Sequence, residues 1–182
     1  MASDEGRASG VDYPTGLSSA HAEGRGGHSV LRRLAPVLFL GLVVALSFSG
    51  IFGGTPNATH RAAAPRAELT VEAPRVLRSG EFFEMRFRIA ATQPLADATL
   101  TVDKAFLHEL TVNTMIPAAA SEEAADGVLR FSYGPLAAGE AIDIKIDGQV
   151  NPRLFLGNEG AVAVADGEVE LARVPLALTV LP

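Results

Sequence analysis

Residues 83–89 read Phe-Glu-Met-Arg-Phe-Arg-Ile, in which four large apolar side chains alternate with three charged ones. Successive side chains of an extended chain point to opposite faces, so this alternation predicts a β-strand with one buried and one solvated face. The same signal recurs on both sides of the segment. Seven further segments alternate in this way or form a short apolar run: 68–73, 99–103, 128–133, 142–147, 161–165, 169–171 and 174–180.

Glycine-containing turns separate several of these segments. Asp-Gly pairs favour tight turns between strands, and they stand at 126–127, 147–148 and 166–167. No stretch after residue 66 has a helical period beyond a single short turn at 118–125. About eight short strands within residues 67–182 therefore predict an all-β domain, an immunoglobulin-like antiparallel β-sandwich. The irregular stretch 105–125 is expected to cross between its two sheets.

Two turns carry a family resemblance. Arg78-Ser-Gly-Glu81 and Ala137-Ala-Gly-Glu140 each precede an alternating strand, and the second lies within Gly134-Pro-Leu-Ala-Ala-Gly-Glu-Ala-Ile-Asp-Ile-Lys-Ile146. Over residues 67–182 the chain resembles the bacterial CARDB-type and related immunoglobulin-like repeat modules of envelope proteins. The resemblance implies a sandwich used for adhesion, spacing or assembly, and it brings no catalytic residue with it.

Residues 34–52 form a block of 19 residues without one charged side chain. A helix of this length covers about 28 Å, close to the hydrocarbon thickness of a bilayer. We therefore expect a single transmembrane signal-anchor helix, with Pro36 in its first turn, and the lipid bilayer as a partner. Ala62-Ala63-Ala64 offers small residues for cleavage but lies well downstream of the block, so a secreted form after cleavage is the alternative.

The flanks of this block predict its orientation. Arg32 and Arg33 precede it, whereas Gly53 and Gly54 follow it. The positive-inside rule then places the N-terminus in the cytoplasm and residues 67–182 in the periplasm or outside the cell. Since the chain has 15 Lys and Arg of which only 2 are Lys, and is rich in Ala and Gly, we expect a bacterial protein of the inner (cytoplasmic) membrane.

Around the helix, residues 1–33 are predicted to be a disordered cytoplasmic tail and residues 53–66 a flexible stalk, because both are rich in small and polar residues. Within and after the block, small residues recur every fourth position, at Gly41, Ala45, Ser49 and Gly53. Such a stripe lets two membrane helices approach closely. Helix pairing and chance alignment of common small residues remain alternatives.

The composition of the chain argues against several kinds of functional site. The chain has no Cys and no Trp and a net charge of −6, and residues 67–182 hold 9 basic against 17 acidic side chains. Nucleic acid is not expected as a partner of so acidic a domain. His108 is the single His of residues 67–182, which is too few ligands for a copper or zinc centre. We predict no catalytic residue, no metal and no cofactor, and hence no enzyme.

Protein contact remains. The predicted loop 151–157 contains Leu154, Phe155 and Leu156, which form an apolar tip if they are exposed; the alternative is that they cap the end of the core. Phe106 and Leu107 are a second candidate contact. The sequence thus predicts a single-pass membrane protein that presents its sandwich outside the cytoplasm, as an accessory or scaffold subunit of a membrane-protein complex. A membrane-anchored ligand-binding or sensing module is the alternative.

Overall fold

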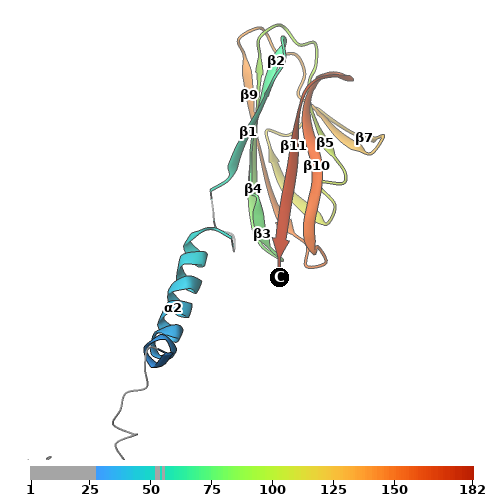
Figure 1. Cartoon of the computed structure of the whole chain (residues 1–182). Coiled ribbons are helices and arrows are strands. Elements are labelled where there is room, and N and C mark those ends of the chain that lie inside the picture. The colour runs from blue at the N-terminus through green and yellow to red at the C-terminus, as the bar shows by residue number, and fades with distance from the viewer. Residues whose placement is uncertain (1–27, 52–53, 55) are drawn as a thin grey trace, which may run out of the picture. The chain divides into compact units, whose positions relative to one another are not determined.

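The computed structural model describes residues 28–51, 54 and 56–182. The chain divides into two compact units, residues 1–45 and 46–182, and each is described by itself. The first unit contains most of helix α2, His28–Phe48. The second contains the strands, which form two layers packed face to face (Figure 1).

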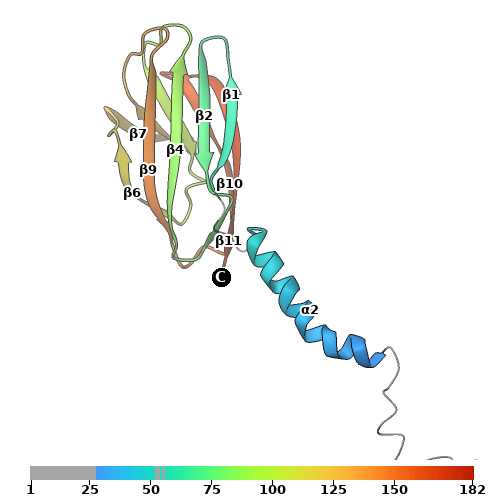
Figure 2. The ribbon, with the colours of Figure 1, turned by 90° about the vertical axis from the view of Figure 1, so that its left-hand side faces the viewer.

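Eleven strands lie within the described residues. Their bounds are β1 Ala58–Ala63, β2 Ala67–Ala73, β3 Val76–Arg78, β4 Phe82–Ala91, β5 Ala98–Asp103, β6 Leu110–Ile116, β7 Ser121–Ala125, β8 Val128–Ser132, β9 Ala141–Val150, β10 Leu156–Asp166 and β11 Val169–Leu181. The first sheet has the order β1-β2-β4-β9-β6, and the second β3-β11-β10-β5-β8-β7. Figure 2 shows β1, β2, β4, β9 and β6 side by side. Neighbours are antiparallel except β3 and β11, which run parallel. The predicted β-sandwich is confirmed.

The core lies between the two sheets and follows the predicted alternation. In β4, Phe83, Met85, Phe87 and Ile89 are buried while Glu84, Arg86 and Arg88 are not. The opposite layer is formed by the inward residues of the second sheet, which are Leu100, Val102, Val162, Val164, Val174, Leu176, Leu178 and Val180. Fully burying one such large apolar side chain stabilises a fold by about 1.5–3 kcal/mol.

The prediction of a flexible stalk over residues 53–66 is wrong for its second half. Residues 58–63 form β1, which pairs with β2 at the edge of the first sheet. Its sequence, Ala-Thr-His-Arg-Ala-Ala, has no large apolar residue, so it gives no apolar alternation. Backbone hydrogen bonding to β2, rather than burial of side chains, places this strand.

The irregular stretch 105–125 crosses between the sheets, as predicted. It supplies β6 to the first sheet and β7 to the second. Residues 118–125, where the sequence allowed at most a short helical turn, contain no helix, because residues 121–125 pair with β8. Asp126 and Gly127 have φ angles of 51° and 79°, the left-handed pair of a tight hairpin turn, and this hairpin determines the strand.

Asp147-Gly148 is not the turn that its sequence predicts. Both residues lie inside β9. A Cβ at Gly148 would stand 2.4 Å from Cζ of Phe83 and 2.6 Å from the carbonyl oxygen of Thr111. This glycine is therefore required for close packing between strands and not for a change of direction.

Helix α2 begins earlier and ends earlier than predicted. Pro36 is inside the helix rather than in its first turn. Ser49 follows the last helical residue, and its hydroxyl donates to the carbonyl of Leu46. The large apolar side chains from Leu34 to Phe48 are all exposed, from 37% at Leu46 to 88% at Phe48. Within the described ranges, no helix combines the length and apolar character that a membrane span requires.

Candidate functional site

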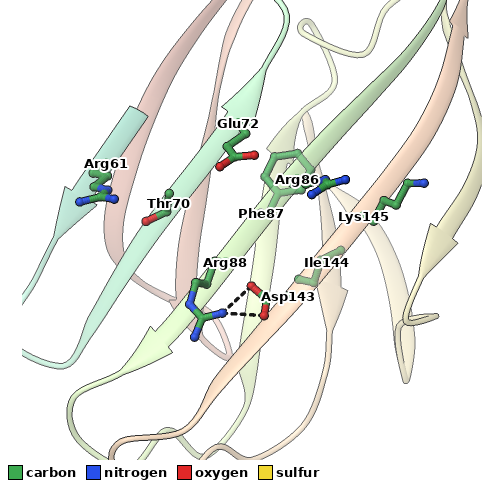
Figure 3. Close-up of a pocket in the computed structure, with 9 residues that line it drawn as sticks. All are labelled: Arg61, Thr70, Glu72, Arg86, Phe87, Arg88, Asp143, Ile144 and Lys145. Carbon is green, nitrogen blue, oxygen red and sulfur yellow. Dashed lines mark hydrogen bonds and ion pairs between the residues drawn. The ribbon is translucent and has the colours of Figure 1, made fainter. Parts of the chain in front are cut away.

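The outward face of the first sheet carries four basic side chains around a shallow concavity. Because side chains alternate along a strand, the residues between the buried positions of β4 point away from the core. These are Glu84, Arg86 and Arg88. Arg61 on β1 and Lys145 on β9 join them on the same face (Figure 3).

Strand register arranges these side chains in two rows. The first row contains Arg61, Thr70, Arg88 and Asp143, one from each of β1, β2, β4 and β9. The second row contains Thr59, Glu72, Arg86 and Lys145. Adjacent strands lie about 4.8 Å apart, so the small Thr70 leaves a gap between two guanidinium side chains.

A shallow concavity of about 440 Å³ lies over these rows. Its lining consists of Arg61, Thr70, Glu72, Arg86, Phe87, Arg88, Asp143, Ile144 and Lys145. Phe87 and Ile144 belong to the core, with 1% exposure each, and so contribute a fixed floor. The lining has four basic and two acidic side chains, in a domain that is acidic as a whole.

Ion pairs hold most of the cations in place. Arg88 donates twice to the carboxylate of Asp143, at 2.8 and 2.6 Å, and Figure 3 shows this fork. Arg86 donates to Glu84 at 2.6 Å, and Lys145 bridges Glu84 and Asp147 at 2.8 and 3.2 Å. Such exposed pairs add little stability. They do restrict where the charged groups can lie.

The same contacts shift the ionisation of this network. Hydrogen bonds from Lys145 and Arg86 lower the pKa of Glu84. The hydrogen bond to Glu84 raises the pKa of Lys145, with that to Asp147 acting in the same sense. The network therefore stays charged on both sides of neutral pH.

Arg61 differs from its neighbours. Its side chain forms no ion pair or hydrogen bond with the other described residues, and neither does the side chain of Glu72. Arg61, the hydroxyl of Thr70 and Arg88 together offer donors along one row. A carboxylate or another anion of similar size is the group that such donors bind.

The predicted apolar tip 154–156 divides into two parts. Leu154 is 6% exposed and caps the core, so its prediction as a contact residue is wrong. A turn in which the N–H of Leu154 donates to the carbonyl of Asn151 directs it inward. Phe155 and Leu156 are 69% and 88% exposed.

The second predicted contact is wrong for Phe106, which is 2% exposed and lies in the core. The chain holds it there because the side-chain amide of Asn158 donates to the carbonyl of Phe106, at 3.0 Å. Leu107 is half-buried against the same core. Neither residue offers the free apolar surface that its sequence predicts.

The predicted helix-packing residues are only partly on the helix. Gly41 and Ala45 lie on α2, whereas Ser49 lies beyond its end and Gly53 lies outside the described residues. Arg32 and Arg33 are exposed residues of the same helix. Within the described part of the chain, no three His, Asp or Glu side chains gather as metal ligands.

Sequence reasoning missed the concavity on the first sheet. The signal was present in the outward positions of the alternating strands, where Arg86 and Arg88 follow each other on β4. Arg61 could not be found in this way, because β1 was not recognised as a strand. Only the sheet order brings β1 and β9 to the two sides of the same face.

Comparisons with known proteins give distant likenesses only. No protein-family model matches the chain, and no curated protein does. The solution structure of CaCohA2 from Clostridium acetobutylicum has 10% identity and a TM-score of 0.41, over 58% of this chain and 85% of that one. A non-cellulosomal cohesin from the hyperthermophilic archaeon Archaeoglobus fulgidus has 11% identity and a TM-score of 0.37, over 60% and 88%. At these values neither likeness assigns a function, and the CARDB-type resemblance stays a prediction.

Proposed function

We propose that the chain is a non-enzymatic, single-pass membrane protein of bacteria, whose sandwich acts outside the cytoplasm as an accessory or scaffold subunit of a membrane-protein complex. Its contact with the partner is made by the outward face of the first sheet. The observation that carries this proposal is the cationic concavity around Arg61, Thr70 and Arg88. An acidic segment of a partner protein is the chemistry that fits it.

Three properties of the concavity support this reading. Its floor belongs to the rigid core, so little entropy is lost on binding. Its lining has four basic and two acidic side chains, which favours an acidic partner, and Arg86 and Lys145 are already paired with Glu84 and Asp147 at its rim. Arg61 has no ion-pair partner among the described residues, so its own contact with an anion does not first break an internal ion pair, whereas Arg88 is paired with Asp143.

The membrane anchor is part of the same proposal. Residues 34–52 are uncharged, and four consecutive side chains of α2, Val37 to Leu40, are 60–68% exposed. Consecutive residues are about 100° apart around a helix, so apolar surface surrounds it on all sides. Such a helix needs an apolar environment, which a bilayer supplies. Arg32 and Arg33 support an N-terminus in the cytoplasm.

Crosslinking in native membranes tests the partner contact. A photoreactive residue at position 59, an exposed position on the same face of β1 as Arg61, is expected to join the full chain to one discrete protein, while the same residue at the exposed position 123 on β7 is not. Arg61→Glu should abolish recovery of that protein, and Arg130→Glu on the other sheet should leave it unchanged. Equal recovery with both variants would refute the proposed surface.

A membrane-anchored module that binds a small anionic ligand is the second candidate. The concavity volume of about 440 Å³ is in the range of small-molecule sites. Native mass spectrometry of the detergent-extracted full chain distinguishes the two. A bound small molecule that is lost in Arg61→Glu would favour the ligand, whereas a bare chain that still crosslinks from position 59 would favour the protein partner.

A further inference from the structure

One end of the sandwich presents three large apolar side chains to solvent. Phe82, Phe155 and Leu156 are 70%, 69% and 88% exposed. Phe82 begins β4 and pairs with Gln149, next to the last residue of β9. The loop that follows β9 contains Phe155 and leads to Leu156, the first residue of β10. The three side chains therefore come from both sheets but meet at the same end.

The chain holds these side chains outward although the core is adjacent. Leu154 enters the core and its two successors do not. Leu156 has a φ of 70°, a left-handed conformation that costs a non-glycine residue free energy. Gly157 follows with a φ of 114°. The backbone at this point exposes two apolar residues instead of burying them.

Basic side chains lie at the same end of the sandwich as the exposed apolar ones. Arg153 is exposed in the same loop, and Arg75 and Arg78 are exposed at the two ends of β3. Residues 78 and 181 are paired across β3 and β11, which places β3 at this end. Carboxylates lie at this end too. Glu81 accepts from the N–H of Arg78, Glu109 accepts from the side-chain amide of Asn151, and Glu84 and Glu159 line hollows beside Phe82 and Arg75. Arg153 lies on the same loop as Phe155, so a cation and the exposed apolar side chains are neighbours along the chain.

The chain enters the sandwich at this same end. The side-chain amide of Asn57 donates to the carbonyl of Glu84 at 2.7 Å, and Gly54 lines a small hollow together with Phe82. Residues 49–56 are all that separate the last residue of α2 from Asn57. The nine Cα–Cα steps from Phe48 to Asn57 span at most about 32 Å, so the chain between the end of α2 and the sandwich is short.

We infer that the end formed by Phe82, Phe155, Leu156 and Arg153 rests on the surface of the bilayer. The inference rests on the proposed anchor. The apolar side chains enter the interface between headgroups and acyl chains, and Arg153 contacts anionic headgroups. Exposed apolar residues beside arginines suit such a surface, and the short connection to α2 makes the contact effectively intramolecular. The sandwich then stands with one end on the membrane.

The absence of Trp from the chain allows a direct test. Phe155→Trp places a single fluorophore in the patch, and Val169→Trp places one at a matched position, because Val169 is 62% exposed at the β10–β11 hairpin on the opposite end. Both full-length variants are reconstituted in phosphatidylcholine–phosphatidylglycerol vesicles containing brominated lipid. We expect the indole at position 155 to emit at shorter wavelength, and to be quenched at least threefold more strongly, than the indole at position 169.

The proposed contact between Arg153 and anionic headgroups is tested separately. Arg153→Glu in the Phe155→Trp chain should reduce the quenching in phosphatidylglycerol vesicles and change it little in pure phosphatidylcholine. Unchanged thermal unfolding of each variant shows that the fold is intact. Equal reduction in both lipids would overturn the role of anionic headgroups.

Flotation of the same vesicles separates this inference from the proposed anchor. If the chain does not float with lipid, the anchor itself is refuted. If it floats while the indoles at positions 155 and 169 are quenched equally little, the anchor stands and the surface contact is refuted, which would leave the apolar end to a protein partner.

Discussion

Single residues determine the strand ends of this sandwich. Gly157 has a φ of 114°, and a Cβ there would stand 1.7 Å from the carbonyl oxygen of Leu178. Gly167 also has a left-handed φ, of 61°, but open space around its Cβ position. Both glycines have a positive φ angle, but only Gly157 lacks room for a Cβ atom. Substitutions at the two positions can therefore be compared.

Gly157→Ala is expected to destabilise the domain by about 2–4 kcal/mol, because it combines backbone strain with overpacking against β11. Gly167→Ala should cost about 1 kcal/mol, from the left-handed conformation alone. Urea unfolding followed by circular dichroism measures both. Equal losses would show that the contact with Leu178 does not matter.

The carboxylate of Asp166 makes the stability of the domain dependent on pH. The N–H of Asp97 lowers its pKa, burial opposes this, and Arg66, at 2.6 Å, lowers it further. A carboxyl with a lowered pKa in the folded state stabilises the fold above its unfolded pKa, and this stabilisation is lost as the pH falls through the folded value.

Asp166→Asn should therefore destabilise the domain at pH 7 by about 1 kcal/mol, since the charge that pairs with Arg66 is removed. The difference from the unchanged chain should begin to shrink as the pH falls below about 4, where Asp166 of the unfolded chain becomes protonated, and should be lost once the pH has fallen through the lower pKa of the folded state. Thermal unfolding at several pH values checks this. A difference that stays constant down to about pH 2 would contradict the assignment.

At the scale of the element, β4 illustrates how one strand serves both the fold and the site. Phe87 faces the core with 1% exposure, and its neighbour Arg86 faces the concavity. The strand lies between β2 and β9 in the first sheet. Because the two faces are chemically separate, substitutions one residue apart should have different consequences.

Phe87→Ala should destabilise the domain by about 3–5 kcal/mol through the cavity that it leaves. Arg86→Ala should leave the unfolding midpoint nearly unchanged, because its ion pair with Glu84 is exposed. The same unfolding assay measures both. A large loss from Arg86→Ala would mean that the ion-pair network stabilises the sheet.

At the scale of the whole molecule, two surfaces of the sandwich have different proposed partners. The cationic concavity is on the outward face of the first sheet, and the apolar end is where the chain enters. Arg61 lines the concavity and Phe155 does not. Their functions should therefore be separable by mutation.

In the Phe155→Trp chain, Arg61→Glu is expected to abolish partner crosslinking and leave lipid quenching of the indole unchanged. Phe82→Ser with Leu156→Ser should weaken the quenching and leave crosslinking from position 59 within about twofold, because neither residue lines the concavity. Both readouts come from the same full-length chain. Loss of both functions in either variant would show that the two surfaces act as one.

Much of the fold follows from local pattern. Period-two alternation identified β2, β4, β5, β8 and β9 with their buried faces, because burial on one face of a sheet demands it. The edge strands of the two sheets, β1, β3, β6 and β7, were missed, since edge strands are held by backbone pairing and these show no clear apolar alternation. Asp147-Gly148 was wrongly predicted to be a turn, because glycine is required where strands pack closely as well as in turns.

The amino-acid sequence is enough to predict that residues 67–182 form a two-layer β domain and to show that residues 34–52 are uncharged, because hydrophobic periodicity and charge are properties of neighbours along the chain. The surfaces that the domain offers follow from its three-dimensional arrangement. This arrangement places Arg61 and Arg88 in one row through strands distant in sequence, and it divides 154–156 into one buried and two exposed residues. Both outcomes depend on sheet order and loop geometry, which arise from contacts between distant segments.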